Sequence, residues 1–206
     1  MRSVDWDARY AASEMVWSAG PNVFVERLCA DLRPGRALDV AGGEGRNALW
    51  LADRGWDATV ADWSQVALDR AAHLWDHRGE DGRHPGRLHV RRADVVHEPL
   101  GDAEYDLVVV CYLQVPADER RAAHASAARA VAPGGRLVVV AHHSDNLTDG
   151  HGGPQDPAVL FTEHDVVADI DGLGLAVVQA EREARTVATA DGERTAWDAV
   201  VVAARA

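Results

Sequence analysis

A glycine-rich stretch, Leu-Asp-Val-Ala-Gly-Gly-Glu-Gly-Arg-Asn, occupies positions 38–47 and begins within a short apolar run. Glycine lets the backbone turn sharply and lets a ligand approach closely, and the start of a following helix adds positive potential. Asp62 ends a second apolar run, and a carboxylate at such a place can accept both hydroxyls of a ribose. Loop and acid together predict a site for a nucleoside-containing ligand. The alternative is that Asp62 only caps a helix beginning near Ser64.

Carboxylates beside this loop indicate which nucleoside would bind. Asp39 and Glu44 would repel a pyrophosphate, and the stretch lacks the G-x-x-G spacing of a dinucleotide turn. S-adenosylmethionine carries a sulfonium and an ammonium group, so the same carboxylates favour this methyl donor. Two rivals are a nicotinamide-dependent oxidoreductase and a non-catalytic module that binds the donor without transferring its methyl group.

Histidines that follow another apolar run are candidates for proton transfer. They are His142, His143 and His151, and an ordinary imidazole pKa of ~6.5 suits a base near neutral pH. The alternative is that they are solvated or fix a loop by hydrogen bonds. Asp145 and Asp149 would complete a metal-binding set, but no Cys/His spacing typical of a metal site accompanies them, so no metal is predicted.

The elements that must position these residues alternate along the chain. Apolar, β-branched runs predict strands at 36–41, 57–62, 88–92, 105–111 and 136–141, with a closing hairpin of 175–187 and 195–203. Helical patterns lie between them, at 5–33 (two helices), at 46–54, after Ser64, at 118–132 and after Thr162. We therefore predict an α/β fold: a Rossmann-like, seven-stranded, mostly parallel sheet with an antiparallel C-terminal hairpin and helices on both faces.

Composition excludes several classes of function. The 206 residues carry a formal net charge of −12, which argues against nucleic-acid binding because phosphates are recognised by Lys and Arg. No run approaches the ~20 apolar residues of a membrane span. Cys29 and Cys111 are the only cysteines, so we expect no disulfide framework and a cytoplasmic location. The oligomeric state stays open between monomer and homodimer.

Residues 38–52 resemble motif I of class I S-adenosylmethionine-dependent methyltransferases. The continuation Glu-Gly-Arg-Asn is similar to the small-molecule branch that includes tellurite-resistance and thiopurine methyltransferases. The resemblance extends through 60–64, 92–95, 105–108 and 132–137. It implies a single domain over 1–206, with an N-terminal helical lid (1–34), a donor-binding core (35–141) and an active-site loop (142–161).

The resemblance also implies roles for individual residues. Asp39 and the glycine loop would hold the methionine part of the donor, Asp62 the ribose, Trp63 the adenine face and Asp94 the adenine amino group. The implied donor-binding set is Trp17, Asp39, Ala41, Gly42, Gly43, Gly45, Asn47, Asp62, Trp63, Ala93, Asp94, Val95 and Cys111.

Three further points concern the lid, the cleft and the acceptor. Trp17 or Tyr10 would cover the donor, unless both simply pack a helix pair. Tyr112, in the transfer cleft after Cys111, joins the catalytic candidates. The family often has Gly and Cys where Ala41 and Gly42 stand. The implied acceptor is a small thiol, chalcogen or heterocyclic N/O compound.

Overall fold

The computed structural model describes residues 20–78 and 84–206. Within them, seven strands form one sheet in the order β3-β2-β1-β4-β5-β7-β6. The strands are β1 (Arg36–Val40), β2 (Asp57–Asp62), β3 (Arg87–Arg92), β4 (Tyr105–Cys111), β5 (Val131–His142), β6 (Leu175–Thr189) and β7 (Gly192–Arg205). Strands β1 to β5 run parallel, β7 pairs antiparallel with β5, and β6 pairs antiparallel with β7. The predicted fold class is confirmed.

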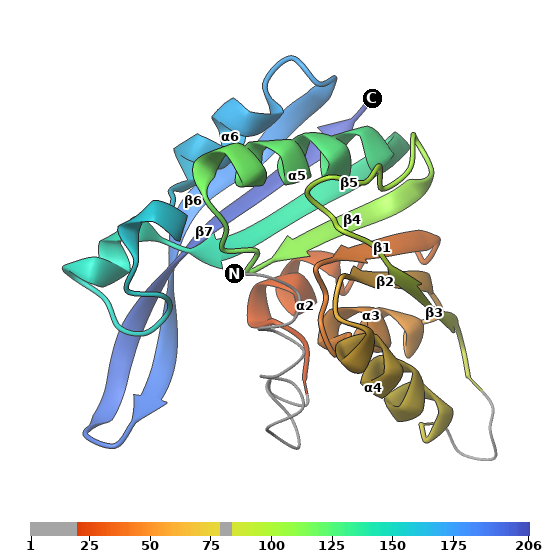
Figure 1. The fold of residues 1–206 in the computed structure, drawn as a ribbon, viewed down its shortest axis with the longest axis horizontal. Helices are drawn as coiled ribbons and strands as arrows, with labels where there is room; N and C mark the ends of the chain where they lie inside the picture. Colours follow the sequence, from red (N-terminus) through yellow and green to blue (C-terminus); the bar gives the residue numbers. More distant parts are fainter. Residues whose placement is uncertain (1–19, 79–83) are drawn as a thin grey trace.

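Helices cover both faces of this sheet (Figure 1). One face carries α2 (Val23–Cys29), α3 (Arg46–Ala52) and α4 (Gln65–Asp76), and the other carries α5 (Ala117–Ala130) and α6 (Glu163–Ile170). Two short 3-10 helices, η2 (Ser144–Leu147) and η3 (Pro157–Val159), lie between β5 and α6.

The central strand β4 shows why the two layers form. Its Leu-Val-Val-Val run is fully buried, as expected of a parallel strand that is covered on both sides. Successive side chains point to opposite faces, so Val109 packs in a core with Leu49 of α3, whereas Val108 packs in a second core with Ala127 of α5. The sheet thus separates two apolar cores.

Among the parallel strands and their helices, the largest boundary difference from the sequence predictions lies between α5 and β5. The helix predicted to reach residue 132 ends at Ala130, and β5 begins at Val131 rather than at 136. Val131 pairs with Tyr105, and a register shift then precedes the main pairing of β4 with β5. A tertiary strand contact therefore overrides the local pattern. The first of the two helices predicted at 5–33 lies outside the described residues.

The C-terminal hairpin is longer than predicted and extends past the sheet. Residues 136–142 of β5 pair with β7 only up to Asp198, so residues 192–197 pair with β6 alone. This outer part of the hairpin projects beyond the end of β5 (Figure 1). None of the helices in the described part of the chain is long and apolar enough to cross a membrane.

Candidate functional site

A cavity of about 920 Å³ opens where the parallel strands end. The glycine loop after β1, the ends of β2, β3 and β4, the loop after β5 and the outer hairpin all contribute to its walls. Carboxyl ends of parallel strands are where α/β folds bind ligands. The cavity therefore lies where the sequence predicted the site.

The glycine loop turns through left-handed backbone. Ala41, Gly43 and Gly45 have φ angles of 53°, 56° and 76°, and Gly45 caps the start of α3. For alanine this conformation costs roughly 1 kcal/mol, so the surrounding structure holds Ala41 there. A Cβ added to Gly42 would lie 2.7 Å from both Asp39 Oδ2 and Val60 Cγ2. Only glycine fits at position 42 without displacing its neighbours.

Asp39 lies directly behind this loop and is buried. Its Oδ2 accepts a hydrogen bond from the backbone N–H of Ala48 at 3.2 Å, whereas its buried Oδ1 has no hydrogen-bond partner among the described residues. Burial raises the pKa of Asp39 to about 7, although hydrogen bonds from Ala48 and Asn47 oppose the rise. A cation placed nearby would favour the charged carboxylate.

Asp62 both fixes the loop and lines the cavity. Its Oδ2 accepts from the backbone N–H of Gly43 at 3.0 Å, and its Oδ1 accepts from the N–H of Ser64 at 2.9 Å. The side chain is buried yet borders the cavity. The two alternatives considered for this residue, a helix-starting cap and a ligand-facing acid, are therefore compatible in one geometry.

A third acid marks the end of β3. Trp63, Asp94 and Val95 line the cavity, whereas Ala93 is buried behind them. Asp94 Oδ1 accepts from the N–H of Val96 at 3.1 Å. Burial raises the pKa of Asp94, but hydrogen bonds from His97 and Val96 outweigh it, so the net pKa is lowered. Asp94 therefore stays charged at neutral pH.

Asn47 joins the loop to the segment before α2. Its Oδ1 accepts from the N–H of Asn22 at 2.9 Å, and Asn22 Oδ1 in turn accepts from the N–H of Phe24 at 2.9 Å to start α2. Asn47 also lines the cavity. Trp17 and Tyr10, expected to form a lid, lie outside the described residues.

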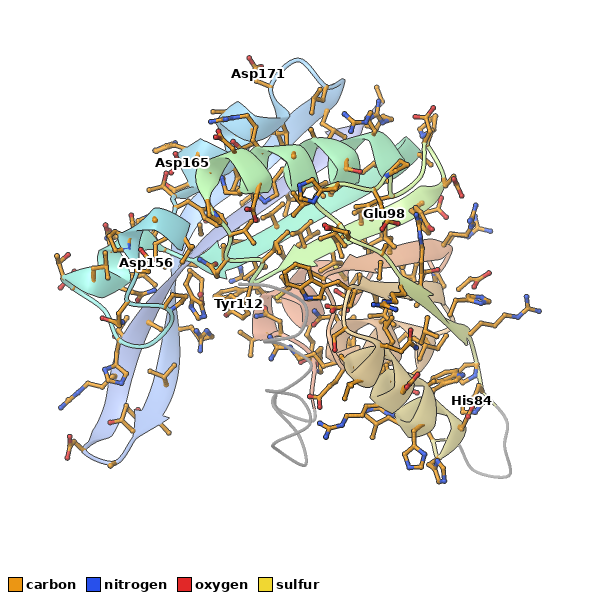
Figure 2. All side chains as sticks on the ribbon, in the orientation of Figure 1. His84, Glu98, Tyr112, Asp156, Asp165 and Asp171 are labelled. Carbon is orange, nitrogen blue, oxygen red and sulfur yellow. The ribbon has the colours of Figure 1, made fainter. Side chains whose placement is uncertain are left out.

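The far end of the cavity is built around Tyr112, which follows β4 with a φ of 59°. Figure 2 labels this side chain between the hairpin and the helices of the first face. The guanidinium groups of Arg46 and Arg185 lie 5.8 and 5.9 Å from the centre of its ring. Burial raises the pKa of the neighbouring Cys111 to about 12, so its thiol stays protonated and is a poor nucleophile.

His142 stacks on Tyr112, with ring centres 4.3 Å apart and planes 18° from parallel. It lines the cavity, and its backbone N–H donates to Gln114 Oε1 at 3.0 Å. Burial, together with the positive charges of Arg185 and Arg46, lowers the pKa of His142 to about 4. The imidazole is therefore uncharged at neutral pH.

The other two candidate histidines lie differently. His151 is exposed and lines the cavity. His143 is buried outside it: Nδ1 accepts from the N–H of Asp145 at 3.0 Å, and Nε2 lies 3.2 Å from Glu163 Oε2. His143 does not line the cavity, because adjacent side chains on extended backbone point to opposite sides and His142 already faces the cavity. His143 instead anchors the loop.

The sequence predictions gave no site role to several cavity residues, among them Arg46, Gln114 and Arg185. Arg46 directly follows the glycine loop, so its position was a usable signal. Arg185 lies on β6, and its Nε donates to Asp198 Oδ2 on β7 at 2.7 Å. No sequence pattern links Arg185 to Tyr112, because the hairpin alone brings them together. Among the described residues, no group of three or more His, Cys, Asp or Glu side chains is arranged to hold a metal ion.

Comparisons with known proteins complete the description. A family model described as a methyltransferase domain matches residues 37–135. A structure reported for the conversion of a disulfide bond into a thioacetal group during echinomycin biosynthesis has 18% identity and a TM-score of 0.78, covering 98% of this chain and 91% of that one.

Two further solved structures resemble the chain. TehB from Haemophilus influenzae has 14% identity and a TM-score of 0.72, covering 100% of this chain and 68% of that one. The glycopeptide N-methyltransferase MtfA, complexed with S-adenosyl-L-methionine, has 17% identity and a TM-score of 0.67, covering 92% and 96%. No curated protein matches the chain in sequence. At these identities the solved structures show a shared fold.

Proposed function

We propose that the chain transfers the methyl group of S-adenosylmethionine to a small-molecule nucleophile, on the premise that a family model described as a methyltransferase domain matches residues 37–135. The matched range falls within the stretch 35–141 that the sequence motifs predicted as the donor-binding core. One observation carries the proposal: the glycine loop, Asp62 at the end of β2 and Asp94 just after β3 line one cavity, and Asp39 of β1 lies buried behind the loop.

The residues at this end of the cavity fit a cationic nucleoside. Asp39 has a buried oxygen without a hydrogen-bond partner among the described residues, and a nearby sulfonium or ammonium group would stabilise its charge. Asp62 and Asp94 border the cavity as acceptors, as ribose hydroxyls and an adenine amino group require. The volume of about 920 Å³ lies at the upper end of the 300–1,000 Å³ usual for ligand sites, so donor and acceptor fit together.

The same carboxylates disfavour the rival dinucleotide. A pyrophosphate needs backbone N–H groups and positive charge at a glycine turn. Here the N–H of Gly43 is already directed at Asp62, and Asp39 lies behind the loop with a buried carboxylate. Asp62 at the cavity wall and Asp39 behind the loop would therefore both disfavour a pyrophosphate, which carries two negative charges.

The donor, when bound, supplies a methyl group already activated by a sulfonium. The protein then has to align a nucleophile with that carbon and keep water out. Apolar side chains at the far end, Leu113, Val115, Val159 and Val187, contribute to the cavity wall, so they would hold an organic acceptor. The loop residues Gly152 and Gly153 close the same side.

The acceptor in this proposal is a small molecule, because the loop after β5 and the outer hairpin wall the cavity on the acceptor side. The net charge of −12 gives no support to a nucleic-acid substrate. We also propose a cytoplasmic location, since Cys29 and Cys111 are both unpaired thiols and a reducing compartment keeps them so.

Isothermal titration calorimetry with S-adenosylmethionine, S-adenosylhomocysteine and NAD⁺ tests the donor. Binding of S-adenosylmethionine and S-adenosylhomocysteine but not of NAD⁺ supports the proposal. Binding of NAD⁺ but of neither of the other two compounds overturns it. Incubation with methyl-labelled donor and a panel of phenols, amines and thiols then separates an enzyme from a binding module. A module binds the donor yet labels no acceptor.

A further inference from the structure

His142 and Asp198 face each other across the β5–β7 pair. They are directly opposite in the strand register, and His142 Nδ1 lies 3.6 Å from Asp198 Oδ1. Both atoms are buried, and neither has a hydrogen-bond partner among the described residues. Catalytic hydrogen bonds are often long before substrate binds and shorten in the complex. A small rotation of the imidazole would satisfy both atoms at once.

The surroundings hold both groups in place. Asp198 is completely buried, and its other oxygen, Oδ2, accepts from Arg185 Nε at 2.7 Å. The His142 ring is stacked on Tyr112 on one side, and on another it is so close to Gly153 that a Cβ there would lie 2.8 Å from the ring. The ring therefore has little freedom except around the Asp198 contact.

We propose that His142 is the general base for methyl transfer, that Asp198 is its positioning residue, and that the acceptor is a hydroxyl compound. The inference rests on the proposed function, because it concerns the acceptor end of the same cavity. With Nδ1 donating to Asp198, the proton of the neutral ring is fixed on Nδ1. Nε2 is then the ring atom that accepts a proton, and the His142 side chain lines the cavity.

Among the described residues, the other groups that could accept a proton here are less suited, because Glu119 and Asp156 line the cavity but are exposed to solvent. Burial raises the pKa of both Cys111 and Tyr112, so neither ionises readily. His143 lies outside the cavity, and His151 is exposed on the loop. His142 alone combines a cavity position with a buried carboxylate beside its ring.

The chemistry of the acceptor follows from the need for a base. A thiol with an ordinary pKa of ~8.5 ionises appreciably near neutral pH, whereas a phenolic hydroxyl with a pKa of ~10 does so far less. In the proposed step, the O–H bond of the acceptor breaks and its proton moves to His142 Nε2. The oxygen bonds to the methyl carbon, the carbon–sulfur bond breaks, and its electron pair stays on sulfur. The imidazolium later releases the proton to water.

The tautomer of His142 provides a test that needs no acceptor. Long-range ¹H–¹⁵N spectra of the full chain, with His142 assigned through a His142→Gln variant, identify which ring nitrogen carries the proton at pH 7. A proton on Nδ1 supports the proposal, and Asp198→Asn should then lower the population of that tautomer. A proton on Nε2 in the wild-type chain overturns it. Circular dichroism checks that each variant is folded.

Kinetics with paired acceptors provides the second test. Labelled donor is supplied with 1-naphthol or naphthalene-1-thiol. His142→Gln should lower kcat for the hydroxyl compound about 100-fold or more, with KM changed less than about threefold. The matched control, His164→Gln, changes a histidine that is 84% exposed on α6 and should leave kcat unchanged. Hydroxyl methylation at the wild-type rate in His142→Gln would overturn the proposal.

A pH profile separates positioning from a merely structural role. The charged and titratable groups facing His142 are Tyr112 after β4, Arg46 of α3, Arg185 of β6 and Asp198 of β7. Asp198→Asn removes the one carboxylate that favours imidazolium, so the acid limb of kcat should move to lower pH. If the acid limb of kcat stays at the same pH in Asp198→Asn, Asp198 does not position His142.

The proposed function and this inference fail in different experiments. Failure to bind the donor in calorimetry would refute the proposed function, whereas the tautomer result for His142 would be unaffected by it.

Discussion

The carboxylate of Asp62 accepts a hydrogen bond from the backbone N–H of Gly43, 3.0 Å away, and so ties the end of β2 to the glycine loop. The other oxygen of Asp62 accepts from Ser64, at the start of α4. One side chain therefore fixes the loop, the strand end and the next helix while bordering the cavity.

Replacing Asp62 with alanine should weaken S-adenosylmethionine binding by roughly 10- to 150-fold, since hydrogen bonds to charged groups are worth about 1.5–3 kcal/mol. Calorimetry measures the affinity directly. Asp76→Ala, which changes an exposed carboxylate on α4, is the matched control and should bind as the wild type does. Equal affinity in Asp62→Ala and Asp76→Ala would remove Asp62 from the donor site.

Asp39 should couple donor binding to proton release. Its pKa is raised to about 7, so at pH 6 most of its carboxyl groups hold a proton, and a bound cation would expel it. Calorimetry at pH 6 in two buffers of different ionisation enthalpy measures the protons released. Asp39→Asn should abolish the difference between buffers. A wild-type signal independent of buffer would contradict the role given to Asp39.

The same residue predicts how stability depends on pH. The folded pKa of Asp39, about 7, lies above the ordinary value of ~3.9. The folded state therefore binds more protons than the unfolded state between these values, so this group lowers the free energy of unfolding as pH rises from about 4 to about 7. Urea unfolding at several pH values should show this decline, and Asp39→Asn should flatten it.

Both thiols should be unreactive in the native protein. Burial raises the pKa of Cys29 and of Cys111 to about 12, and only the thiolate reacts with disulfide reagents. Titration with a chromogenic disulfide at pH 8 should detect no fast thiol in the native chain and two after unfolding. Rapid native reaction of Cys111 would show that the thiol ionises and reopen it as a nucleophile.

A buried ion-pair cluster between α5 and α6 should be important for stability but not for donor binding. Asp169 accepts from Arg120 Nε at 2.7 Å and lies 2.9 Å from His124 Nδ1, with all three side chains buried. Asp169→Ala leaves the buried Arg120 guanidinium with only the longer, 3.9 Å contact to Asp165 and should cost about 3–5 kcal/mol. Asp118→Ala breaks an exposed pair with Arg121 and should cost under about 1 kcal/mol.

Low pH should weaken the stabilisation that the same ion-pair cluster provides. Burial raises the pKa of Asp169, but hydrogen bonds from His124 and Arg120 outweigh it and the net pKa is lowered. The stability that this carboxylate contributes is present above its unfolded pKa and is lost as pH falls through its folded pKa. The gap in unfolding free energy between wild type and Asp169→Ala should therefore narrow in acid. A constant gap would contradict this account.

Local sequence predicted most of the fold and located the glycine loop and Asp62, which the structure places at one cavity. The predicted bounds of the strand at 105–111 agree with those of β4, because a continuous β-branched run is typical of a strand that is buried on both faces. Asp62 and the glycine loop were recognisable because their chemistry depends on short spacing along the chain. Ala41 stands where the resembled family often has glycine, and the structure adds that it adopts a left-handed backbone.

The residues around Tyr112, at the other end of the cavity, were harder to predict from the sequence. Arg185 and Asp198 reach the cavity end only through pairing of β6 with β7, far along the chain from Tyr112. His142 and His143 are adjacent on extended backbone, so only one of the two side chains can point into the cavity. The local sequence does not indicate which one it is. Tertiary pairing, rather than local propensity, decides both points.

The outer hairpin has a consequence for how this protein can change. Residues 184–189 and 192–197 pair as strands only with each other, and Val187, Ala188 and Thr189 border the cavity. Mutations at these three positions would therefore alter one wall of the cavity without changing the glycine loop or the acids at the ends of the parallel strands. Natural selection or protein engineering could therefore change the acceptor specificity through the outer hairpin while the rest of the cavity keeps its sequence.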